Sequence, residues 1–399
     1  MNLPDNVQLI ISTLESGGYE AFVVGGCVRD AQRGVVPKDW DIATSATPHQ
    51  AKALFSRTVD TGIKHGTITV VLDRSHYEVT TYRIDGEYLD NRRPASVTFS
   101  GCIEEDLSRR DFTMNAIAYN PNKGFVDPFH GRRDIKNRII RCVGNPAHRF
   151  AEDALRMLRA IRFAGVTGFV VDDEILLATS RLKENLQDVS PERIREELGK
   201  LITSPHPQAI TMLDSTGLLP FVLGREYEGD LAQNIRHLQV CPPLEPLRLA
   251  VFLQDDSASV LKDLRFDNKT IREVCQYARF LPAPLPIGRY EIKKLLRVLP
   301  REHFENLLIL KNIVQPEQKQ LHEQIHQEIE DIFCQGECFT LKDLAVNGSD
   351  LAQLGIAPGE AMGNILEELL DAVMRDADLN CKGILLDMVK FSWLALPTN

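Results

Sequence analysis

The chain has 399 residues, of which 43% are hydrophobic and 26% are charged, and its formal net charge is −10. This composition is typical of a globular protein long enough for more than one core. The acidic balance excludes a chain that is polycationic throughout, but nucleic-acid binding needs only a local basic surface. No segment has the pattern of a signal peptide or of a membrane span, and the eight cysteines form no CxxC pair. We therefore expect a cytoplasmic protein with reduced thiols and no membrane association.

The first third of the chain has the pattern of short strands, and the remainder has the pattern of helices. β-Branched and aromatic residues lie between turn signals in AFVVGG (21–26), WDIAT (40–44), TITVVL (67–72) and YEVTTYRI (77–84). From about residue 134 onward, apolar residues recur with the period of a helix. In SPERIREELGKLI, Ser190 can cap a helix and Pro191 suits its first turn. The predicted fold class is α+β, a small mixed sheet followed by a mostly helical remainder.

Two aspartates in DWDIAT lie one residue apart. On a strand, Trp40 and Ile42 would face the core, and Asp39 and Asp41 would share the opposite side. Two adjacent carboxylates repel each other unless a cation lies between them, and Mg²⁺ prefers one or two carboxylates together with substrate phosphates. Glu78, on a neighbouring predicted strand, is a candidate third carboxylate. The alternative is that all three are solvated side chains.

The segment FVVGGCVRD combines a strand, a glycine pair and the start of a helix. The backbone N–H groups of this turn and the positive end of the helix dipole suit a phosphate. Arg29 can add a charge-assisted contact. The G-x-G-x-x-G spacing of dinucleotide-binding folds is absent, so an oxidoreductase of that type is not expected.

A basic segment follows the sheet region. Residues 131–163 contain nine Lys and Arg against three Asp and Glu. Within AEDALRMLRAIRFAG (151–165), which has a helical pattern, charged residues recur every three positions beside an apolar stripe: Asp153, Arg156, Arg159 and Arg162. A solvated helix face is the usual meaning of such charges. Because these arginines border the apolar stripe, we expect them to line a boundary instead of pointing fully outward.

The segment HEQIH (322–326) matches the H-E-x-x-H zinc motif. Its surroundings are polar and no convincing third ligand follows. We expect His322 and His326 to be surface residues of a helix and not a zinc site.

Several motifs together resemble one known family. FVVGGCVRD with PKDWDIAT, EEDLSRRDFTMNAIAYN, VDPFHGRRDI, AEDALRMLRAIRFA and SPERIREEL are similar, in order and spacing, to the motifs of class II tRNA nucleotidyltransferases, the CCA-adding enzymes. The resemblance covers roughly residues 20–200 and extends more weakly to LKDLAVNGSDLAQLGI in the C-terminal part. It implies a nucleotidyltransferase head, a helical neck for base recognition, a helical body and a tRNA-binding tail, which we place at residues 1–133, 134–203, 204–281 and 282–399.

The resemblance also implies an activity and a set of site residues. The activity is Mg²⁺-dependent, template-independent addition of C, C and A to the 3′ end of tRNA from CTP and ATP, with release of pyrophosphate. Asp39 and Asp41 resemble the catalytic, metal-binding carboxylates, with Glu78 as a further candidate. Eight further residues resemble the family's nucleotide-binding positions. Gly26 and Arg29 resemble contacts to the triphosphate, and Arg110 and Asp111 resemble contacts to triphosphate and ribose. Asp153 and Arg156 resemble contacts to the base, and Arg159 and Arg162 resemble neighbouring nucleotide or scaffold contacts.

Related activities are distinguished by single features. Bacterial poly(A) polymerases carry an Arg-Arg-Phe-type element where this chain has GIKHGTITV, and CC-adding enzymes lack the loop that is present here at residues 85–99. LAVFLQDD (249–256) contains no His-Asp pair, so no phosphohydrolase activity is expected. A non-catalytic RNA-binding protein with the same fold would be expected to lack Asp39 or Asp41. These features favour addition of the complete CCA end.

Overall fold

The structure is a computed structural model that describes residues 1–86 and 97–394. Most of the loop expected at residues 85–99 therefore lies outside the described residues. The chain divides into two compact units. The first contains residues 1–239, 243–245 and 259–267, and the second contains residues 240–242, 246–258 and 268–399.

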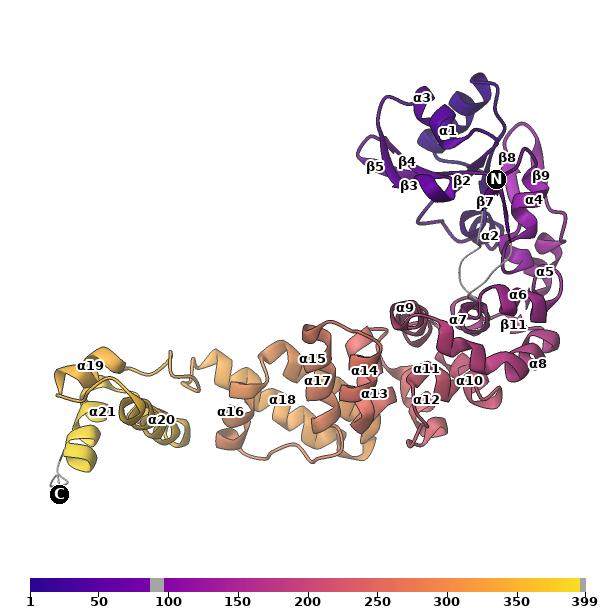
Figure 1. Cartoon of the computed structure of the whole chain (residues 1–399). Helices are drawn as coiled ribbons and strands as arrows, with labels where there is room; N and C mark the ends of the chain where they lie inside the picture. Colours follow the sequence, from indigo (N-terminus) through magenta and orange to yellow (C-terminus); the bar gives the residue numbers. More distant parts are fainter. Residues whose placement is uncertain (87–96, 395–399) are drawn as a thin grey trace. The chain divides into compact units, whose positions relative to one another are not determined.

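A seven-stranded mixed sheet forms the N-terminal part of the first unit (Figure 1). The strand order is β3-β4-β5-β2-β1-β8-β9, in which β2 and β5 are parallel and the other neighbours are antiparallel. The strands are β1 (Ala21–Val24), β2 (Ile42–Thr44), β3 (Thr58–Gly62), β4 (Thr67–Leu72), β5 (Ser75–Thr81), β8 (Ala118–Asn120) and β9 (Gly124–Val126). A separate hairpin pairs β6 (Arg83–Asp85) with β7 (Val97–Phe99). The predicted α+β fold is confirmed.

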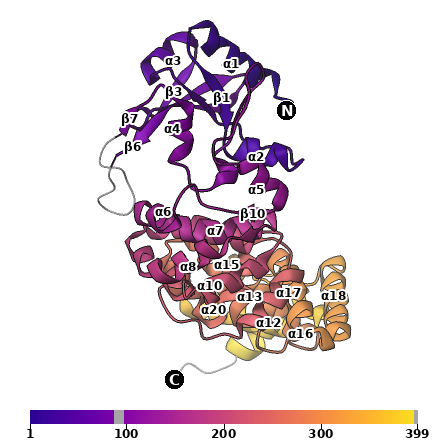
Figure 2. The same ribbon diagram turned by 90° about the vertical axis from the view of Figure 1, so that its right-hand side faces the viewer.

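Helices cover both faces of this sheet (Figures 1 and 2). α1 (Asp5–Ser16) buries Val7, Ile10, Ile11 and Leu14, which recur at helical spacing, and it contacts β1 and α3 (Pro48–Leu54). On the other face, α4 (Ile103–Ser108) packs against side chains of β1 in a shared core cluster. The four residues of β1 are all buried, so this central strand has lost the alternation of a half-exposed strand.

The predicted strand at residues 40–44 is shorter than expected. β2 begins at Ile42, and Trp40 is half-buried instead of facing the core. The pairing with β1 nevertheless extends one residue further, because the Val24 N–H donates to the Asp41 carbonyl at 3.0 Å. Asp39 and Asp41 therefore belong to the extended segment that leads into the strand.

The rest of the first unit is mainly helical. Its longer helices are α5 (Gly131–Asn137), α6 (Pro146–Glu152), α7 (Leu155–Thr167), α8 (Asp173–Leu182), α9 (Pro191–Ile202), α10 (Thr211–Ser215), α11 (Leu219–Leu223) and α12 (Leu231–Val240). β10 (Ile139–Ile140) and β11 (Val170–Val171) form a short parallel pair. Pro191 begins α9 as predicted, but Ser190 occupies the N-cap position without a side-chain capping bond.

The helix predicted over residues 151–165 is two helices. Asp153 has extended backbone angles (φ −150°, ψ 102°) between α6 and α7. Its Oδ1 accepts a hydrogen bond from the Leu155 N–H at 3.2 Å. An aspartate that satisfies a free N–H in this way starts a new helix, which explains why the periodic pattern continues across the break.

The C-terminal elements are helical and have a core of their own. They are α13 (Glu245–Leu253), α14 (Ser257–Asp263), α15 (Asn268–Phe280), α16 (Arg289–Val298), α17 (Arg301–Val314), α18 (Lys319–Cys334), α19 (Gly348–Gln353), α20 (Glu360–Arg375) and α21 (Lys382–Val389). The expectation that His322 lies on the surface is wrong: its side chain is 1% exposed, and its Nδ1 lies 2.8 Å from Asn312 Oδ1. His326 is exposed. In the described parts of the chain, no helix is both long and apolar enough to span a membrane.

Candidate active site

The central strands bring three sequence motifs to one end of the sheet. β1 ends at Val24, and the turn at Gly25 leads into α2 (Gly26–Gln32). Because β2 runs antiparallel to β1, Asp41 at its start lies beside that turn. β5 runs parallel to β2 with Val79 opposite Ile42, so Glu78 precedes the pairing at the same end as Asp41.

Gly25 is the most constrained residue of the glycine pair. Its backbone has φ 74° and ψ −123°, a conformation that residues other than glycine rarely adopt. A Cβ atom at this position would also lie 2.8 Å from Arg110 Nη1. The phosphate contact predicted at Gly26 stays a prediction, and the closest approach of backbone and guanidinium in the glycine pair occurs at Gly25.

A cavity of about 440 Å³ gathers most of the predicted nucleotide-binding residues. The predicted residues that line it are Gly26, Arg29, Asp41, Arg110, Asp111, Asp153, Arg156 and Arg159. Its remaining lining residues were not singled out from the sequence: Gly25, Arg109, Asn115, Phe163 and Arg193. Asp39, Glu78 and Arg162 are not among the lining residues. Gly25 and Arg109 are direct neighbours of predicted residues, and Asn115, Phe163 and Arg193 lie in motifs named above, so the signal for all five was present in the sequence.

The acidic part of the site is Asp41 with Asp39 and Glu78 nearby. Asp41 still contacts solvent, but the surrounding protein removes part of its hydration, which raises the pKa of its carboxyl group. The negative charges of Glu78 and Asp39 raise it further, while Arg110 acts in the opposite direction. Such a carboxylate is stabilised by a cation. In the described residues, no three His, Cys, Asp or Glu side chains are arranged to hold a metal by themselves, so a metal ion here would also need ligands from a bound nucleotide.

Two arginines beside the glycine turn are held in place by buried or half-buried aspartates. Arg29 donates to both oxygens of Asp30 at 2.9 Å and to Asn115 Oδ1 at 2.8 Å. Arg110 donates to Asp106 Oδ2 at 3.0 Å, and Asp106 is almost fully buried. The guanidinium groups are therefore pre-positioned, and they concentrate positive charge next to Asp41.

Asp111 is fully engaged with protein donors. Its Oδ2 accepts two hydrogen bonds from Arg159, at 2.9 and 2.6 Å, and its Oδ1 accepts from the Phe112 N–H and from Asn115. Although burial opposes ionisation, the charge of Arg159 and the Asn115 hydrogen bond lower the pKa of Asp111 to about 2. The four bonds use the acceptor positions of an ionised carboxylate. Asp111 thus fixes Arg159 and Asn115 at the cavity wall.

Asp153 and Arg156 line the same cavity but are held by different partners. Asp153 forms a two-point ion pair with Arg193 of α9, at 3.1 and 2.7 Å. Arg156 donates to Glu152 at 2.6 Å and to the carbonyl oxygens of Arg149 and Arg109. The two side chains therefore present an acceptor and a donor with independently fixed orientations.

Arg162 supports the cavity from behind. It is buried, its Nε donates to Glu197 at 2.7 Å, and its guanidinium lies 3.5 Å from the centroid of the Phe163 ring. Arg29 and Arg159 also lie over this ring, at 5.0 and 5.4 Å. Three cations therefore lie around the Phe163 ring. The predicted boundary position of the arginines agrees with this arrangement.

A glycine turn, neighbouring carboxylates and fixed arginines at one end of the central strands are typical of a nucleotidyltransferase. Residues 21–141 match the family model of the poly A polymerase head domain, and residues 247–389 match tRNA nucleotidyltransferase domain 2. Residues 168–228 match the probable RNA- and SrmB-binding site of polymerase A. These matches fit the α+β arrangement of the first unit and the helical arrangement of the second.

Individual relatives specify the family further. The CCA-adding enzyme of Geobacillus sp. (strain WCH70) is 38% identical over 372 residues, which are 92% of this chain and 90% of the relative. The crystal structure of the Bacillus stearothermophilus CCA-adding enzyme in complex with CTP is 32% identical with a TM-score of 0.83, and the match covers 98% of this chain and 99% of that one. The Thermotoga maritima CCA-adding enzyme complexed with tRNA shares the fold, at 22% identity and a TM-score of 0.66, over 97% and 95% of the two chains. The chain belongs to the CCA-adding enzymes, a family of tRNA nucleotidyltransferases, and the resemblance drawn from the motifs is confirmed.

Proposed function

We propose that this chain adds C, C and A to the 3′ end of tRNA, using CTP and ATP and releasing pyrophosphate. The observation that carries the proposal is one cavity lined by Asp41, by phosphate-binding groups around Gly25 and by Asp153 and Arg156. A relative that is 32% identical over nearly the whole chain was solved in complex with CTP. We place the reaction in the cytoplasm.

We propose Mg²⁺ as the metal, with Asp39 and Asp41 as ligands and Glu78 as a further candidate. The residues present fit this metal. Burial and neighbouring negative charges raise the pKa of Asp41, so its carboxylate would be stabilised by a cation, and the arginines and glycines beside it suit a phosphate. When bound, the ions would activate the 3′-hydroxyl of the RNA and neutralise charge on the leaving pyrophosphate.

The protein groups around the glycine turn would bind the triphosphate. The absence of a side chain at Gly25 lets the nucleotide approach the backbone there and at Gly26. Arg29 and Arg110 would donate to phosphate oxygens while their aspartate partners keep them in position. Because these cations need little reorganisation, they would stabilise charge on the phosphates effectively.

The residues of α7 and its neighbours would read the base. After its bonds to Arg193 and the Leu155 N–H, Asp153 keeps one acceptor position on Oδ2. That position suits the amino group of cytosine or adenine, and the guanidinium of Arg156, or of Arg193, suits their acceptors. Uracil and guanine present a carbonyl acceptor where the other two bases have an amino donor, and an N–H donor where those have an acceptor. Both contacts would then be unfavourable, so these two bases are disfavoured.

Asp111 has a different role in this proposal from a simple ribose contact. Its oxygens already accept four hydrogen bonds, so a ribose hydroxyl would have to replace one of them. We therefore propose that Asp111 mainly positions Arg159 and Asn115. Residues 1–133 would then act as the head, 134–203 as the base-recognising neck, and 204–281 and 282–399 as the body and tail that bind tRNA.

The test uses purified protein and a tRNA that ends at the discriminator base. With CTP alone we expect addition of two residues, and with CTP and ATP together we expect three, each resolved on a sequencing gel. Addition that stops after two residues with both nucleotides present would identify a CC-adding enzyme. Long adenosine tracts would identify a poly(A) polymerase, and no addition would contradict the proposed function.

A further inference from the structure

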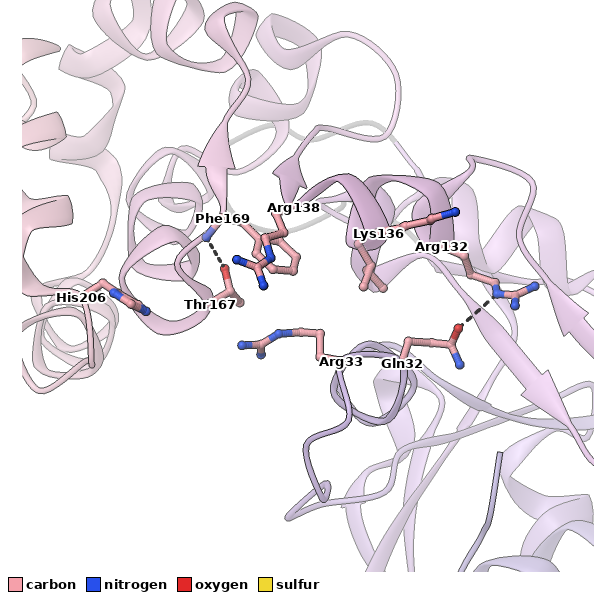
Figure 3. Close-up of a pocket in the computed structure, with 9 residues that line it drawn as sticks. Gln32, Arg33, Arg132, Lys136, Arg138, Thr167, Phe169 and His206 are labelled. Atoms are coloured by element: carbon pink, nitrogen blue, oxygen red, sulfur yellow. Dashed lines mark hydrogen bonds between the residues drawn. The ribbon is translucent and has the colours of Figure 1, made fainter.

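A second cavity, of about 580 Å³, is lined by residues at the C-terminal ends of α2 and α7, among them Gln32 and Thr167 (Figure 3). α2 contributes Gly26 to the active-site cavity and Gln32, its last residue, to the second one. α7 contributes Arg156 to the first and Thr167, its last residue, to the second. We call this second cavity the rear cavity.

The rear cavity is lined by cations without acidic residues. Arg33, Arg132, Lys136 and Arg138 line it, and no Asp or Glu does. Arg33 pairs with Asp30 at 3.2 Å. In residues 1–86 and 97–394, the other three form no ion pair with a carboxylate. In a chain with a net charge of −10, such a concentration of positive charge indicates an anionic ligand.

The rear cavity contains cations of the basic segment that do not line the active-site cavity. Residues 131–163 carry a surplus of six positive charges. Arg156 and Arg159 from that segment line the active-site cavity. Arg132 and Lys136 belong to α5, and Arg138 is the residue between α5 and β10; all three line the rear cavity instead.

The lining indicates the kind of anion. Arg132, Lys136 and Arg138 are exposed, so they are cations at the surface and not buried donors that converge on one small ion. Arg132 also donates to Gln32 at 3.2 Å and lies 4.1 Å from the centroid of the Phe125 ring. The Phe169 ring is buried with Arg33 5.4 Å from its centroid, which leaves no open aromatic face for a base. The Thr167 hydroxyl already donates to the Phe163 carbonyl and accepts from the Phe169 N–H. Long exposed cations without a stacking platform are typical of contacts to the nucleic-acid backbone.

We propose that the rear cavity binds backbone phosphates of the RNA substrate, independently of its sequence. The proposal rests on the proposed function, because it assumes that the substrate is an RNA. α7 has 13 residues, so at a rise of about 1.5 Å per residue it separates the two cavities by about 20 Å. At about 3.4 Å of duplex axis per phosphate of one strand, that distance corresponds to roughly six base pairs. One RNA is therefore long enough to reach both sites. The four cations lie outside residues 168–228, the segment that matches an RNA-binding model.

The test replaces two unpaired cations and compares a matched control. The test variant is Lys136→Gln with Arg138→Gln, and the control is Arg57→Gln with Arg74→Gln. The control arginines are exposed residues of the sheet region that line neither cavity, and Arg74 (φ 65°) has a left-handed backbone like Arg138 (φ 58°). Binding of tRNA without its CCA end is measured by fluorescence anisotropy between 50 and 300 mM KCl.

We expect the test variant to bind tRNA roughly tenfold more weakly near 150 mM salt. The magnitude of its slope of log K against log salt should fall by about 1.5, because each of the two lost phosphate contacts removes about 0.7–0.9 from the slope. The control variant should bind like the wild type. At saturating tRNA, the test variant should keep its kcat and its KM for CTP, since neither residue lines the active-site cavity.

Unchanged affinity and slope in the test variant, or equal losses in the control, would overturn the proposal. Inhibition by inorganic phosphate that disappears in the test variant while tRNA affinity stays normal would assign the cavity to a small anion and also overturn it. Failure of the proposed function would be seen separately, as a wild-type protein that does not extend tRNA. Binding is measured without turnover, so the two failures are distinguishable.

Discussion

Asp153 and Arg193 form a two-point ion pair that joins the α6–α7 junction to α9, with Nη2–Oδ2 at 2.7 Å and Nη1–Oδ1 at 3.1 Å. The Leu155 N–H holds the same carboxylate from a third direction. Asp153 therefore has a fixed orientation at the cavity wall. Base recognition by a carboxylate requires such a fixed orientation. A carboxylate that rotated freely could adjust to the hydrogen-bonding edge of a correct or of an incorrect base.

The Asp153→Ala variant should use CTP and ATP more slowly and should discriminate less against UTP and GTP. Loss of the contact to the correct base should cost about 1–3 kcal/mol, as for a hydrogen bond to a charged group. Loss of the repulsion of a carbonyl should favour the wrong bases. The measurement is kcat/KM for each of the four nucleotides.

Arg193→Ala is the comparison variant, because it frees the carboxylate without removing it. We expect slower use of CTP and ATP with a smaller loss of discrimination than in Asp153→Ala. If Asp153→Ala keeps the preference of the wild type for C and A over U and G, Asp153 does not read the base.

Asp39→Ala and Asp41→Ala should abolish nucleotide incorporation and leave tRNA binding within about twofold of the wild type. Each change removes a carboxylate at the proposed metal position and leaves the basic surfaces intact. Incorporation of labelled CTP and tRNA binding are measured on the same preparations. Asp60→Ala removes an exposed carboxylate of the same sheet, paired with Lys52, and serves as the control. Normal turnover by both active-site variants with Mg²⁺ would contradict the metal assignment.

Gly25→Ala should weaken nucleotide binding more than it destabilises the fold. The added methyl group would lie 2.8 Å from Arg110 Nη1 and would push this cation away from its position. Gly34→Ala is a matched control, since Gly34 has a similar φ of 76° but open space around its Cβ position. Both variants should lose stability from backbone strain, on the order of 1–3 kcal/mol. A raised KM for CTP is expected in Gly25→Ala alone, and equal KM values in the two variants would show that strain explains the effect.

Asp111→Asn should be less stable than the wild type at pH 7, by an amount that shrinks in acid. The pKa of Asp111 is about 2 in the folded protein, below its ordinary value of 3.8. A lowered pKa means that ionised Asp111 stabilises the fold above pH 4 and that this contribution is lost as the pH falls from about 4 to about 2. The shift corresponds to about 2 kcal/mol.

Thermal unfolding midpoints at pH values between 2.5 and 7 test this expectation. The midpoints of the wild type and of Asp111→Asn should converge toward pH 2.5. The Asp60→Asn variant should follow the wild-type curve throughout. Curves for Asp111→Asn and the wild type that stay parallel would show that Asp111 titrates like an ordinary carboxylate.

The sequence by itself determined the features whose cause is local. The glycine pair after a buried strand, the two aspartates before the next strand and the arginines beside Asp111 are close in the chain, so their spacing already indicates shared chemistry. The order of sheet and helices follows from apolar periods of two and 3.6 residues. Together with the family resemblance, these signals were sufficient for the fold class and for eight of the thirteen residues that line the candidate active-site cavity.

The tertiary structure alone decided which distant groups meet. Arg193 lies 40 residues from Asp153, Arg159 lies 48 residues from Asp111, and Arg29 lies 86 residues from Asn115. Helical periodicity places a residue on a face, but it does not identify the element that covers this face. Asp153 ends α6 because its carboxylate satisfies the Leu155 N–H and Arg193 together, and the second partner arrives only when α9 packs against α7. His322 is buried for the same reason: the polar pattern of α18 predicts exposure, and the neighbouring α17 supplies Asn312 as a partner for its ring.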